Sequence, residues 1–375
     1  MKIALVCDWY HPRIGGIERH LQDLAGTLVA ARHEVVVITP TPGDDRVDGI
    51  RVRRISAPRA PRFGFLVTPA GVRAVGDALA DERVDVAHCH VSIVSPAAMG
   101  GAAQAVRRGI PTVVTFHSVV PQTHLLARAA RVTLGTATWP ARFSAVSERV
   151  AREIRAVSPN EMAILANGID VDAWRMQPAP RSDDTVRLIS IMRLNAKKRP
   201  LKLVDLIRAL NARLPQEKPA RLCVVGDGPE RGRLERAISR YGLGDQIEVA
   251  GQRSRSEIRD LLASSDVFVL PTVRESFGIA ALEARCAGLP VVAMRASGVA
   301  GLIEHGLEGL LAESDVELVS HVARLVYDSE LRAAISDHNR RTSPPFDWPR
   351  TVDAHLAIYR EAIALRDSAC ADMNR

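Results

Sequence analysis

Aromatic residues, cysteines and long apolar runs are scarce in this chain. Phe, Trp and Tyr make up 4% of its 375 residues, which leaves few platforms for stacking nucleic-acid bases. Five widely spaced cysteines form neither a zinc-ligand pattern nor a disulfide framework. No apolar run approaches the roughly 18 residues of a membrane span, and the run after Lys2 stops at Asp8, too early for a signal peptide. The chain is therefore predicted to be a soluble, cytoplasmic protein that does not bind nucleic acid.

Lysine is also rare, although the chain is basic. Of the 50 basic residues, 5 are Lys and 45 are Arg, and the formal net charge is +7. Hydrophobic residues make up 47% of the chain, which excludes general disorder. The length predicts two domains of ~150 residues each. Against this arginine background, the adjacent Lys197 and Lys198 indicate a place where a compact, mobile ammonium group matters.

Short apolar runs alternate with amphipathic helical stretches along the chain. In the first part, strands are predicted at 3–7, 35–38, 84–87 and 113–116, with a helix after Gly15-Gly16. In the second part, strands are predicted at 188–192, 222–225, 247–249, 267–270 and 291–293. This alternation is typical of open parallel sheets with helices on both faces, so the fold class is α/β with two consecutive domains.

A segment without periodicity divides the two domains. Residues 173–186 contain two prolines and mixed charges, and we predict them as a linker between a first domain at 1–172 and a second at 187–345. Residues 346–375 are predicted as a C-terminal helix that packs back on the first domain. Ser254 and Glu257 predict a capping box at the start of one helix in the second domain.

Ligands of parallel sheets bind at the carboxyl ends of the strands, and four loops place special residues there. Gly15 and Gly16 follow the first strand and would let a phosphate approach the backbone, although an ordinary tight turn explains them equally well. Arg193 and Lys198 follow the first strand of the second domain, where two cations suit a diphosphate; the alternative is a solvated charged loop.

The third loop, Gly226-Asp227-Gly228, joins a strand to a helix and invites a dinucleotide-binding interpretation. Its third glycine position holds Arg231, and the first domain has no GxGxxG motif, which argues against a nicotinamide-dependent dehydrogenase.

The fourth loop, LPTVRESFGIAALEARCAGLPVV, carries Glu275 and Glu283 eight residues apart. We expect Phe277, Gly278 and Ile279 to expose their amides at a helix N-terminus, where an anion would bind. Carboxylates beside a diphosphate make sense as acceptors of hydrogen bonds from hydroxyls, and a nucleotide-sugar supplies such hydroxyls.

In their order along the chain, these segments resemble the retaining family-four glycosyltransferases. The resemblance covers nearly the full length: GGIERHLQDLA, TFHS, SAVSE, NGID, MRLNAKK, GDGPE, ESFGIAALEA, and a closing FDW followed by Tyr359. It implies the GT-B fold, in which two Rossmann-like, doubly wound domains face a cleft. Phosphatidylinositol mannosyltransferase-like enzymes are among the proteins that this chain is similar to.

The resemblance also implies residue roles in the second domain. Glu283 would bind the ribose and Glu275 the transferred sugar. Arg193 and Lys198 would hold the diphosphate as it leaves. The backbone around Gln252-Arg253 would hold the base, beside the helix N-terminus described above.

In the first domain, the resemblance implies that Gly15-Gly16 approaches the phosphates and that His117 lies near the sugar and the acceptor. The alternative for His117 is a structural histidine at a strand end. The family retains the anomeric configuration by front-face attack without a proven protein nucleophile, so the paired glutamates do not serve as acid and nucleophile of a hydrolase.

No cofactor and no metal are implied by the resemblance. Asp170-Val171-Asp172 spells the metal-binding DxD motif of another glycosyltransferase fold, but here it belongs to the NGID turn. Two departures from the family pattern stand out. Met192 replaces the first Gly of the usual GRL, and Ser297–Gly301 replaces a Gly-Gly-x-Pro-Glu turn, with Gly301 in the position of the Glu. The second departure leaves the donor sugar open.

Arginines alternate with apolar residues in two stretches of the first domain. Residues 1–180 carry a net charge of +5, against +2 for 181–375. The stretches contain Arg51, Arg53, Arg54, Arg59, Arg62, Arg73, Arg107, Arg108, Arg128, Arg131 and Arg142, and among them Phe63, Phe65, Leu66, Val67, Leu125, Leu126, Val132, Leu134 and Trp139. This composition resembles the membrane-contacting acceptor domain of lipid-modifying relatives, and a solvated arginine-rich face is the alternative.

The sequence thus predicts a retaining glycosyltransferase that moves a hexose from a GDP- or UDP-linked sugar to a lipid or glycan acceptor at the cytoplasmic face of the membrane. A nucleotide-sugar 2-epimerase of the same fold and a non-catalytic nucleotide-sugar-binding protein are the alternatives. The sugar, base, acceptor and linkage are left open.

Overall fold

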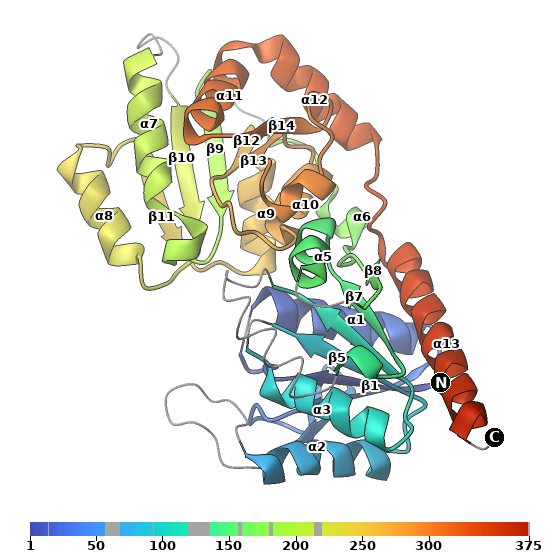
Figure 1. Ribbon diagram of the computed structural model, residues 1–375. Helices are drawn as coiled ribbons and strands as arrows, with labels where there is room; N and C mark the ends of the chain where they lie inside the picture. The colour runs from blue at the N-terminus through green and yellow to red at the C-terminus, as the bar shows by residue number, and fades with distance from the viewer. Residues whose placement is uncertain are drawn as a thin grey trace. The chain divides into compact units, whose positions relative to one another are not determined.

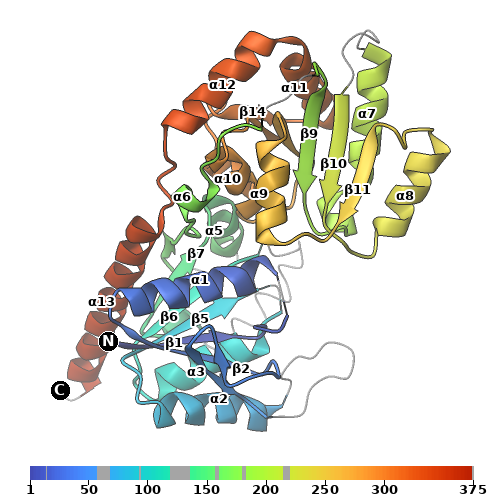
Figure 2. The same cartoon turned by 180° about the vertical axis from the view of Figure 1, so that it is seen from behind.

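The computed structural model describes residues 1–13, 15–56, 68–92, 94–118, 136–156, 160–179, 183–213 and 220–373. The chain folds into two α/β units, of which unit 1 comprises Met1–Gly168 with Phe346–Arg375, and unit 2 comprises Ile169–Pro345. Each unit has its own sheet with helices on both faces (Figures 1 and 2). None of the described helices combines the length and the apolar character needed to span a membrane.

Unit 1 is built on an eight-stranded sheet in the order β3-β4-β2-β1-β5-β6-β7-β8. Neighbouring strands are parallel except β3 and β4, which pair antiparallel. The strands are β1 (Lys2–Cys7), β2 (Glu34–Thr39), β3 (Arg46–Val47), β4 (Ile50–Arg54), β5 (Val86–Val91), β6 (Thr112–Phe116), β7 (Ala141–Ala145) and β8 (Met162–Ile164). The strands predicted at 3–7, 35–38 and 113–116 are confirmed. The strand predicted at 84–87 instead begins at Val86 and continues to Val91, which places two histidines in the sheet.

Helices cover both faces of this sheet (Figures 1 and 2). One face packs against α1 (Gly16–Ala30) and α13 (Trp348–Met373), and the other against α2 (Pro69–Asp81) and α3 (Pro96–Arg107). The alternation along β1 explains this layering, because Leu5 packs in the core with Leu21 and Leu24 of α1, whereas Val6 faces Gly101 of α3. The remaining described helices are α5 (Glu148–Arg155) and the 3₁₀ turn η1 (Thr136–Thr138).

The C-terminal helix α13 belongs to unit 1. Its first residue, Trp348, covers Gly168 so closely that a Cβ there would lie 2.5 Å from the indole ring. Tyr359 is fully buried, and Glu361 pairs with Arg142 of β7 at 3.3 Å. The helix predicted to pack back on the first domain therefore lies on unit 1 and continues to Met373.

Unit 2 is built on a six-stranded parallel sheet in the order β11-β10-β9-β12-β13-β14. The strands are β9 (Val186–Ile191), β10 (Ala220–Val225), β11 (Ile247–Gly251), β12 (Val267–Leu270), β13 (Val291–Met294) and β14 (Gly309–Ala312). All five strands predicted here are present, and β14 was not predicted. Since β10 lies on one side of β9 and β12 on the other, the order reverses between β9 and β12.

The helices of unit 2 also lie on both faces of its sheet. In Figures 1 and 2, α7, α8 and α11 cover one face, and α9 and α10 cover the other. The elements are α6 (Val171–Trp174), α7 (Leu201–Arg213), α8 (Arg231–Arg240), α9 (Arg255–Ala263), α10 (Ile279–Cys286), α11 (Asp315–Tyr327), α12 (Ser329–Arg341), and the 3₁₀ turns η2 (Ala196–Lys198) and η3 (Gly298–Gly301). The capping box predicted for Ser254 and Glu257 is confirmed at the start of α9.

The predicted linker at 173–186 does not separate the two units. The boundary falls earlier, after Gly168, and the predicted segment packs on unit 2. Trp174 is buried under the guanidinium of Arg255 at 5.2 Å, and the amide of Ala179 donates to the carbonyl of Ala263. The buried Trp174 and the hydrogen bond of Ala179 therefore attach this irregular, proline-containing segment to unit 2.

Candidate functional site

The carboxyl ends of the strands of unit 2 gather the charged residues predicted to form a site. The loops after β9 and β12 start at neighbouring strands, on either side of the point where the strand order reverses. Open α/β sheets bind their ligands at such switch points. The loops after β10, β11 and β13 open at the same edge of the sheet, because all these strands are parallel.

The loop after β9 presents two cations. Asn195 caps the 3₁₀ turn η2, and its side-chain oxygen accepts from the amide of Lys198 at 3.1 Å. Lys198 is half-buried and its ammonium group binds the carboxylate of Glu275. Arg193 is exposed, and no carboxylate of the described residues forms an ion pair with it. The loop therefore offers one guanidinium free of carboxylate partners and one ammonium held in place.

Glu275 and the N-terminus of α10 come from the loop after β12. The two oxygens of Glu275 differ, because Oε2 receives Lys198 while Oε1 accepts from the amide of Ser276 at 3.1 Å. Gly278 adopts a left-handed backbone (φ 104°) that begins α10 at Ile279. Phe277 is buried beside it. The expected helix N-terminus is therefore formed, and its first amides have no partner within the helix.

Glu283 lies in the same helix, about one turn after its start, and its side chain is 7% exposed. The helix begins only at Ile279, which keeps Glu283 near the carboxyl ends of the strands. The structure thus places Glu275 and Glu283 on one loop and helix at the switch point, with Glu275 the more accessible carboxylate.

The Gly226-Asp227-Gly228 loop packs against the loop after β9 (residues 192–199), which we call the cation loop because it carries Arg193 and Lys198. A Cβ on Gly226 would lie 1.9 Å from the carbonyl oxygen of Met192, and one on Gly228 would lie 2.3 Å from that of Leu194. Leu194 donates its amide to the carbonyl of Asp227 at 2.9 Å. These glycines are therefore required for close contact between two backbones. That contact explains a glycine-rich loop that fails the dinucleotide motif.

A second glycine contact supports the Glu275 loop. The amide of Gly298, in η3 after β13, donates to the carbonyl of Glu275 at 2.9 Å. A Cβ on Gly298 would lie 2.1 Å from the carbonyl oxygen of Ser276. By contrast, nothing lies within 4 Å of a Cβ on Gly301. The turn at Ser297–Gly301, which departs from the family pattern, thus keeps the hydrogen bond between Gly298 and Glu275. At Gly301, where the family has a glutamate, there is open space.

Gln252 and Arg253 follow β11, at the end of the sheet nearest to α8 and α9. Both are exposed, and Arg253 pairs with Glu257 at 3.6 Å. They open at the same edge as the cation loop, two strands away from β9. Their predicted contact with a base remains a prediction.

Unit 1 presents a glycine turn at the carboxyl end of β1. Gly15 is the N-cap of α1 in an extended conformation without a side-chain cap, and Gly16 is exposed as the first helical residue. The carboxylate of Glu18 lies against Gly15, where it leaves no room for a Cβ. The turn therefore ends in an accessible helix N-terminus, in keeping with both interpretations of the two glycines.

Asp8, which follows β1 directly, was not among the predicted site residues. Its two oxygens accept from the amides of Ala97 and Ala98 at the start of α3, at 2.9 and 3.1 Å. Burial raises the pKa of Asp8 to about 6 despite these hydrogen bonds. Asp8 thus ties the loop after β1 to the neighbouring strand's crossover helix.

Five buried histidines gather in the core of unit 1. They are His20 on α1, His88 and His90 on β5, His117 after β6, and His355 on α13. Neighbouring rings connect the cluster: the centroids of His88 and His90 lie 3.9 Å apart, and those of His20 and His117 lie 5.8 Å apart. Only His117 was predicted. The spacing of two residues between His88 and His90 in a strand indicates a shared face, and that signal was missed.

Hydrogen bonds link His88 and His90 of β5 to β6, to α13 and to His117. The Nδ1 atom of His88 lies 2.8 Å from the hydroxyl of Tyr359, and its Nε2 atom lies 2.6 Å from that of Thr115. Nδ1 of His90 lies 2.9 Å from Nε2 of His117. Because one imidazole of that pair must donate, the protonation of His90 decides whether the remaining nitrogen of His117 accepts or donates.

All five histidines are held uncharged at neutral pH. Burial lowers the pKa of each ring, most explicitly to about 3 for His117 and to about 4 for His355, and repulsion between the rings acts in the same direction for His20, His88, His90 and His117. The side chain of His117 is 5% exposed. It can therefore act as a neutral hydrogen-bonding group and not as a cation.

The DxD-like residues have structural roles. The carboxylate of Asp170 caps α6 by accepting from the amide of Ala173 at 3.0 Å, and Asp172 pairs with Arg175 at 3.7 Å. Among the described residues, no group of three or more His, Cys, Asp or Glu side chains is arranged to hold a metal ion. Independence from metal stays a prediction.

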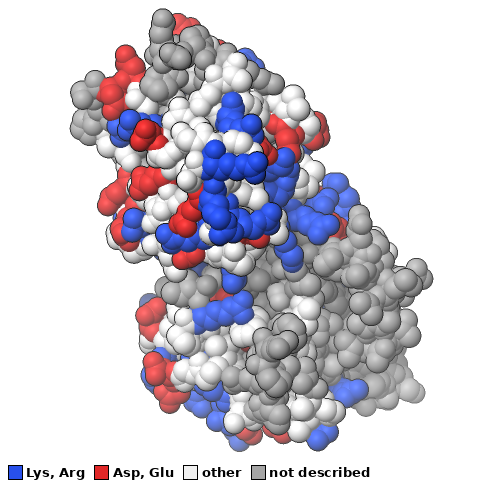
Figure 3. All heavy atoms as spheres, turned by 90° about the vertical axis from the view of Figure 1, so that its left-hand side faces the viewer, with Lys and Arg blue, Asp and Glu red and all other residues white. Residues whose placement is uncertain are grey.

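The predicted basic surface of unit 1 is described only in part. Residues 57–67 and 119–135, with most of its apolar side chains, lie outside the described residues. Four of its described arginines pair with carboxylates: Arg51 with Glu82, Arg53 with Asp81, Arg108 with Asp77 and Arg142 with Glu361. In unit 2, Lys and Arg gather on the face shown in Figure 3.

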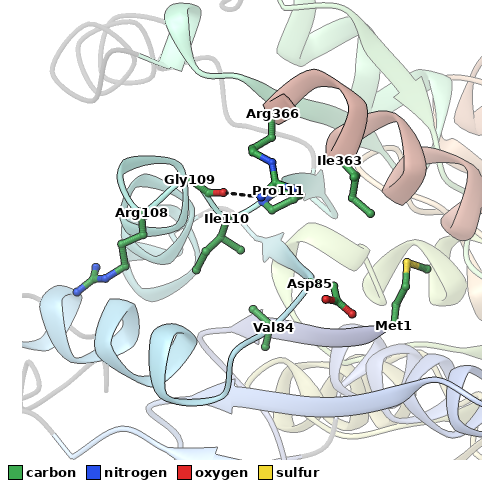
Figure 4. Close-up of a pocket in the computed structure, with 9 residues that line it drawn as sticks. All are labelled: Met1, Val84, Asp85, Arg108, Gly109, Ile110, Pro111, Ile363 and Arg366. Carbon is green, nitrogen blue, oxygen red and sulfur yellow. Dashed lines mark hydrogen bonds between the residues drawn. The ribbon is translucent and has the colours of Figure 1, made fainter. Parts of the chain in front are cut away.

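A hollow of about 570 Å³ lies at the amino ends of the strands of unit 1 (Figure 4). Arg366 of α13 reaches across it to the carbonyl of Gly109 at 3.1 Å, and Arg108 points away from it toward Asp77. Asp85, on its other side, accepts from the amide of Lys2. Its charged groups are thus engaged in the fold, and it lies at the opposite end of the sheet from His117.

The fold and the charged switch-point loops are those of a nucleotide-sugar-dependent glycosyltransferase of the GT-B type. Residues 14–173 match the family Glycosyltransferase Family 4, and residues 172–342 match the family Glycosyl transferases group 1. The chain therefore belongs to these glycosyltransferases, and the predicted family and fold are confirmed.

Similar proteins agree with this assignment. The chain is 29% identical to a GDP-mannose-dependent alpha-mannosyltransferase of Mycobacterium tuberculosis, over 99% of both chains. It is 23% identical to the phosphatidylinositol N-acetylglucosaminyltransferase gpi3 subunit of Schizosaccharomyces pombe, over 99% of this chain and 81% of the relative. Anabaena HepE in complex with UDP-glucose shares the fold with a TM-score of 0.75 and 21% identity, over 98% of this chain and 100% of HepE.

Proposed function

We propose that this enzyme transfers mannose from GDP-mannose, with retention of configuration, to a lipid or glycan acceptor at the cytoplasmic face of the membrane. The observation that carries the proposal is the pairing of Lys198 with Glu275 at the switch point of unit 2, beside Arg193 and the N-terminus of α10. Among nucleotide-sugars we favour GDP-mannose, because the mannosyltransferase relative is similar over the whole chain.

The residues of this edge suit a departing diphosphate. In the transfer, the bond between the anomeric carbon and the diphosphate oxygen breaks, and a bond to the acceptor oxygen forms on the same face of the sugar. The acceptor's proton passes to the leaving phosphate oxygen. Negative charge grows on the diphosphate during this step, and Arg193, Lys198 and the amides of α10 are the groups that would stabilise it.

Glu275 is arranged as a hydrogen-bond acceptor. Lys198 and the amide of Ser276 already engage its two oxygens, so neither oxygen is free to attack the sugar as a nucleophile. We therefore assign Glu275 to the hydroxyls of the transferred sugar and Glu283 to the ribose. Gln252 and Arg253 are assigned to the base. This arrangement supports front-face transfer without a covalent enzyme intermediate and without a metal.

The neutral imidazole of His117 is assigned to a hydroxyl of the sugar or the acceptor, and Gly15-Gly16 to the phosphates. A histidine that stays uncharged can exchange hydrogen bonds with a hydroxyl without placing a competing cation near the diphosphate. Its hydrogen bond to His90 would fix the ring's orientation.

A lipid acceptor is supported by the phosphatidylinositol-modifying relative and by the arginine-rich, apolar stretches of the first domain. Each arginine near an anionic surface contributes roughly 1 kcal/mol, and salt screens this attraction. Sedimentation with liposomes that contain phosphatidylinositol should show binding that weakens with salt. No sedimentation with these liposomes at any salt concentration would remove the membrane from the proposal.

The donor and the reaction can be tested together. Thermal-shift measurements with GDP-mannose, UDP-glucose, UDP-galactose and UDP-GlcNAc should single out GDP-mannose, because a ligand that binds the folded state raises its midpoint. Turnover with a lipid extract and EDTA should then release GDP and give an α-linked product, identified by its anomeric proton. Conversion of a sugar nucleotide without acceptor would indicate the epimerase instead, and binding without turnover would indicate the non-catalytic protein.

A further inference from the structure

Lys198 is followed by a residue in an unusual backbone conformation. Arg199 adopts φ 58° and ψ 46°, the left-handed region in which a Cβ crowds the following carbonyl. It ends η2, and Pro200 and α7 follow at once. Glycine is the residue that adopts this conformation freely. Arg199 therefore holds a backbone conformation that glycine would adopt with less strain.

The guanidinium of Arg199 binds two other segments of unit 2. One nitrogen donates to the carbonyl of Pro271 at 2.9 Å, and another donates to both oxygens of Asp315 at 2.6 and 2.5 Å. Pro271 directly follows β12, and Asp315 begins α11. Burial acts to raise the pKa of Asp315, but hydrogen bonds and attraction to Arg199 and Lys202 lower it, so the carboxylate is ionised.

Thr272, the next residue of the loop after β12, forms a hydrogen bond with the backbone of Lys198. Thr272 is fully buried, and its hydroxyl donates to the carbonyl of Lys198 at 3.1 Å. Pro271 and Thr272 thus bind Arg199 and Lys198 in turn, and Glu275 lies three residues further along the same loop. Any movement of the cation loop relative to the β12 loop would break these contacts together.

We propose that Arg199 is a positioning residue that holds Lys198 in register with Glu275 and with the diphosphate subsite. The proposal deepens the proposed function and rests on it. Arg199 does not touch the ligand. It fastens the loop after β9 to the end of β12 and to the start of α11, so that the ammonium group of Lys198 meets the diphosphate without first having to be ordered.

A difference between two nucleotides isolates this role from general stability. GDP carries the second phosphate that Lys198 would bind, and GMP lacks it, so their affinity ratio reports the placement of the ammonium group. Isothermal titration should show that the wild-type protein prefers GDP and that Lys198→Ala removes most of this preference. UDP and UMP are titrated in parallel in case the base is uracil.

Arg199→Gly is the decisive variant, because it relieves the backbone while removing the guanidinium. We expect it to lower the ratio of the affinities for GDP and GMP roughly tenfold, which is the loss expected when one charge-assisted hydrogen bond is removed. Asp315→Asn, which keeps the shape but removes the charge, should lower the ratio in the same direction by less. The matched control is Arg187→Ala, which breaks the pair with Asp183 at the opposite end of β9 and should leave the ratio unchanged.

The outcomes separate this proposal from the function on which it rests. If Lys198→Ala loses the preference but Arg199→Gly and Asp315→Asn keep the wild-type ratio, Arg199 serves the fold alone and the proposal is overturned. If Arg187→Ala lowers the ratio as much as Arg199→Gly, the effect is general destabilisation, with the same consequence. If the wild-type protein binds neither diphosphate more tightly than its monophosphate, the assignment of the diphosphate to Lys198 fails first.

Discussion

The two units present opposite chemistry at the carboxyl ends of their strands. Unit 2 offers accessible charges, with Arg193 in solvent and Lys198 paired with Glu275. Unit 1 offers buried and uncharged groups, with His117 hydrogen-bonded to His90. The same α/β architecture therefore supports two kinds of surface. One suits a highly charged diphosphate, and the other suits hydroxyl groups that require hydrogen bonds without net charge.

We expect the largest effect at the charged edge of unit 2, the carboxyl ends of its strands where Arg193, Lys198 and Glu275 lie. Lys198→Ala should reduce kcat/KM by roughly 100-fold or more, because the variant loses a cation that acts on the leaving group in the transition state. Steady-state turnover of GDP-mannose checks this. Lys197→Ala is the matched control, since Lys197 is exposed one residue earlier on the same turn, and it should retain near wild-type turnover. Equal losses in both variants would mean that positive charge on the loop matters and the position of Lys198 does not.

The uncharged cluster predicts that acid destabilises unit 1 before unit 2. Histidine ordinarily ionises near pH 6.5, and below that pH the unfolded chain binds protons that the folded cluster excludes. Stability should therefore fall from about pH 6.5 toward pH 3, with a slope approaching about 1.4 kcal/mol per pH unit for each histidine. Asp8 acts in the opposite direction, because its raised pKa lets the folded state bind a proton more readily than the unfolded state.

Pulsed hydrogen exchange at a fixed labelling pH, after incubation at pH 7, 5 and 4, measures the two units separately. Amides of β5 and β6 should lose protection at a higher pH than those of β12 and β13. In the described part of unit 2, burial also lowers the pKa of His321, but this is one partly buried ring against five in unit 1, so the loss there should be smaller. Simultaneous loss in both units would contradict the assignment of acid sensitivity to the cluster.

A smaller effect is expected at the glycine that supports Glu275. Gly298→Ala places a Cβ against the backbone of Ser276, so the loop must shift, and turnover should fall roughly tenfold because the carboxylate is displaced. Gly301→Ala, three residues later on the same 3₁₀ turn, meets open space and should have little effect. Comparing kcat/KM of the two variants tests whether close packing at Gly298 matters for the site.

The smallest effect is expected in the histidine cluster itself. Tyr359→Phe removes the hydroxyl that lies 2.8 Å from His88 and should lower the free energy of unfolding by about 1–2 kcal/mol. Thermal unfolding of the variant provides the measurement. Tyr241→Phe serves as control, because Tyr241 is exposed in unit 2 and its ring contact with Arg208 does not need the hydroxyl. A Tyr359 variant as stable as the control would show that the hydrogen bond is not needed.

Local patterns in the sequence predicted the central strands and the loops of the charged edge. Every residue of a run such as Val267–Leu270 is buried, so the run is apolar throughout and a strand can be predicted from the local sequence alone. The rule that parallel strands end at a common edge placed the loops of Lys198 and Glu275 together, but their ion pair was not predicted. Family resemblance supplied the roles of these residues, which spacing alone left open.

Long-range contacts were beyond such patterns. His88 and Tyr359 meet across 271 residues, and Arg199 reaches Asp315 across 116, so neither pair leaves a local signal. The position of the unit boundary was missed for a related reason, because burial of Trp174 depends on a helix that follows much later in the chain. Short strands such as β8 and β14 are stabilised by their neighbours in the sheet more than by their own composition.

Hydrogen exchange with and without GDP-mannose tests the central claim most directly, because it locates the donor on the chain. GDP-mannose should protect the amides of 193–199 and 275–283 in unit 2, and Lys198→Ala should remove that protection while Lys197→Ala preserves it. The three UDP-sugars are tested in parallel. Protection by none of the four nucleotide-sugars, or protection confined to segments of unit 1, would contradict the assignment of the donor to the charged edge of unit 2.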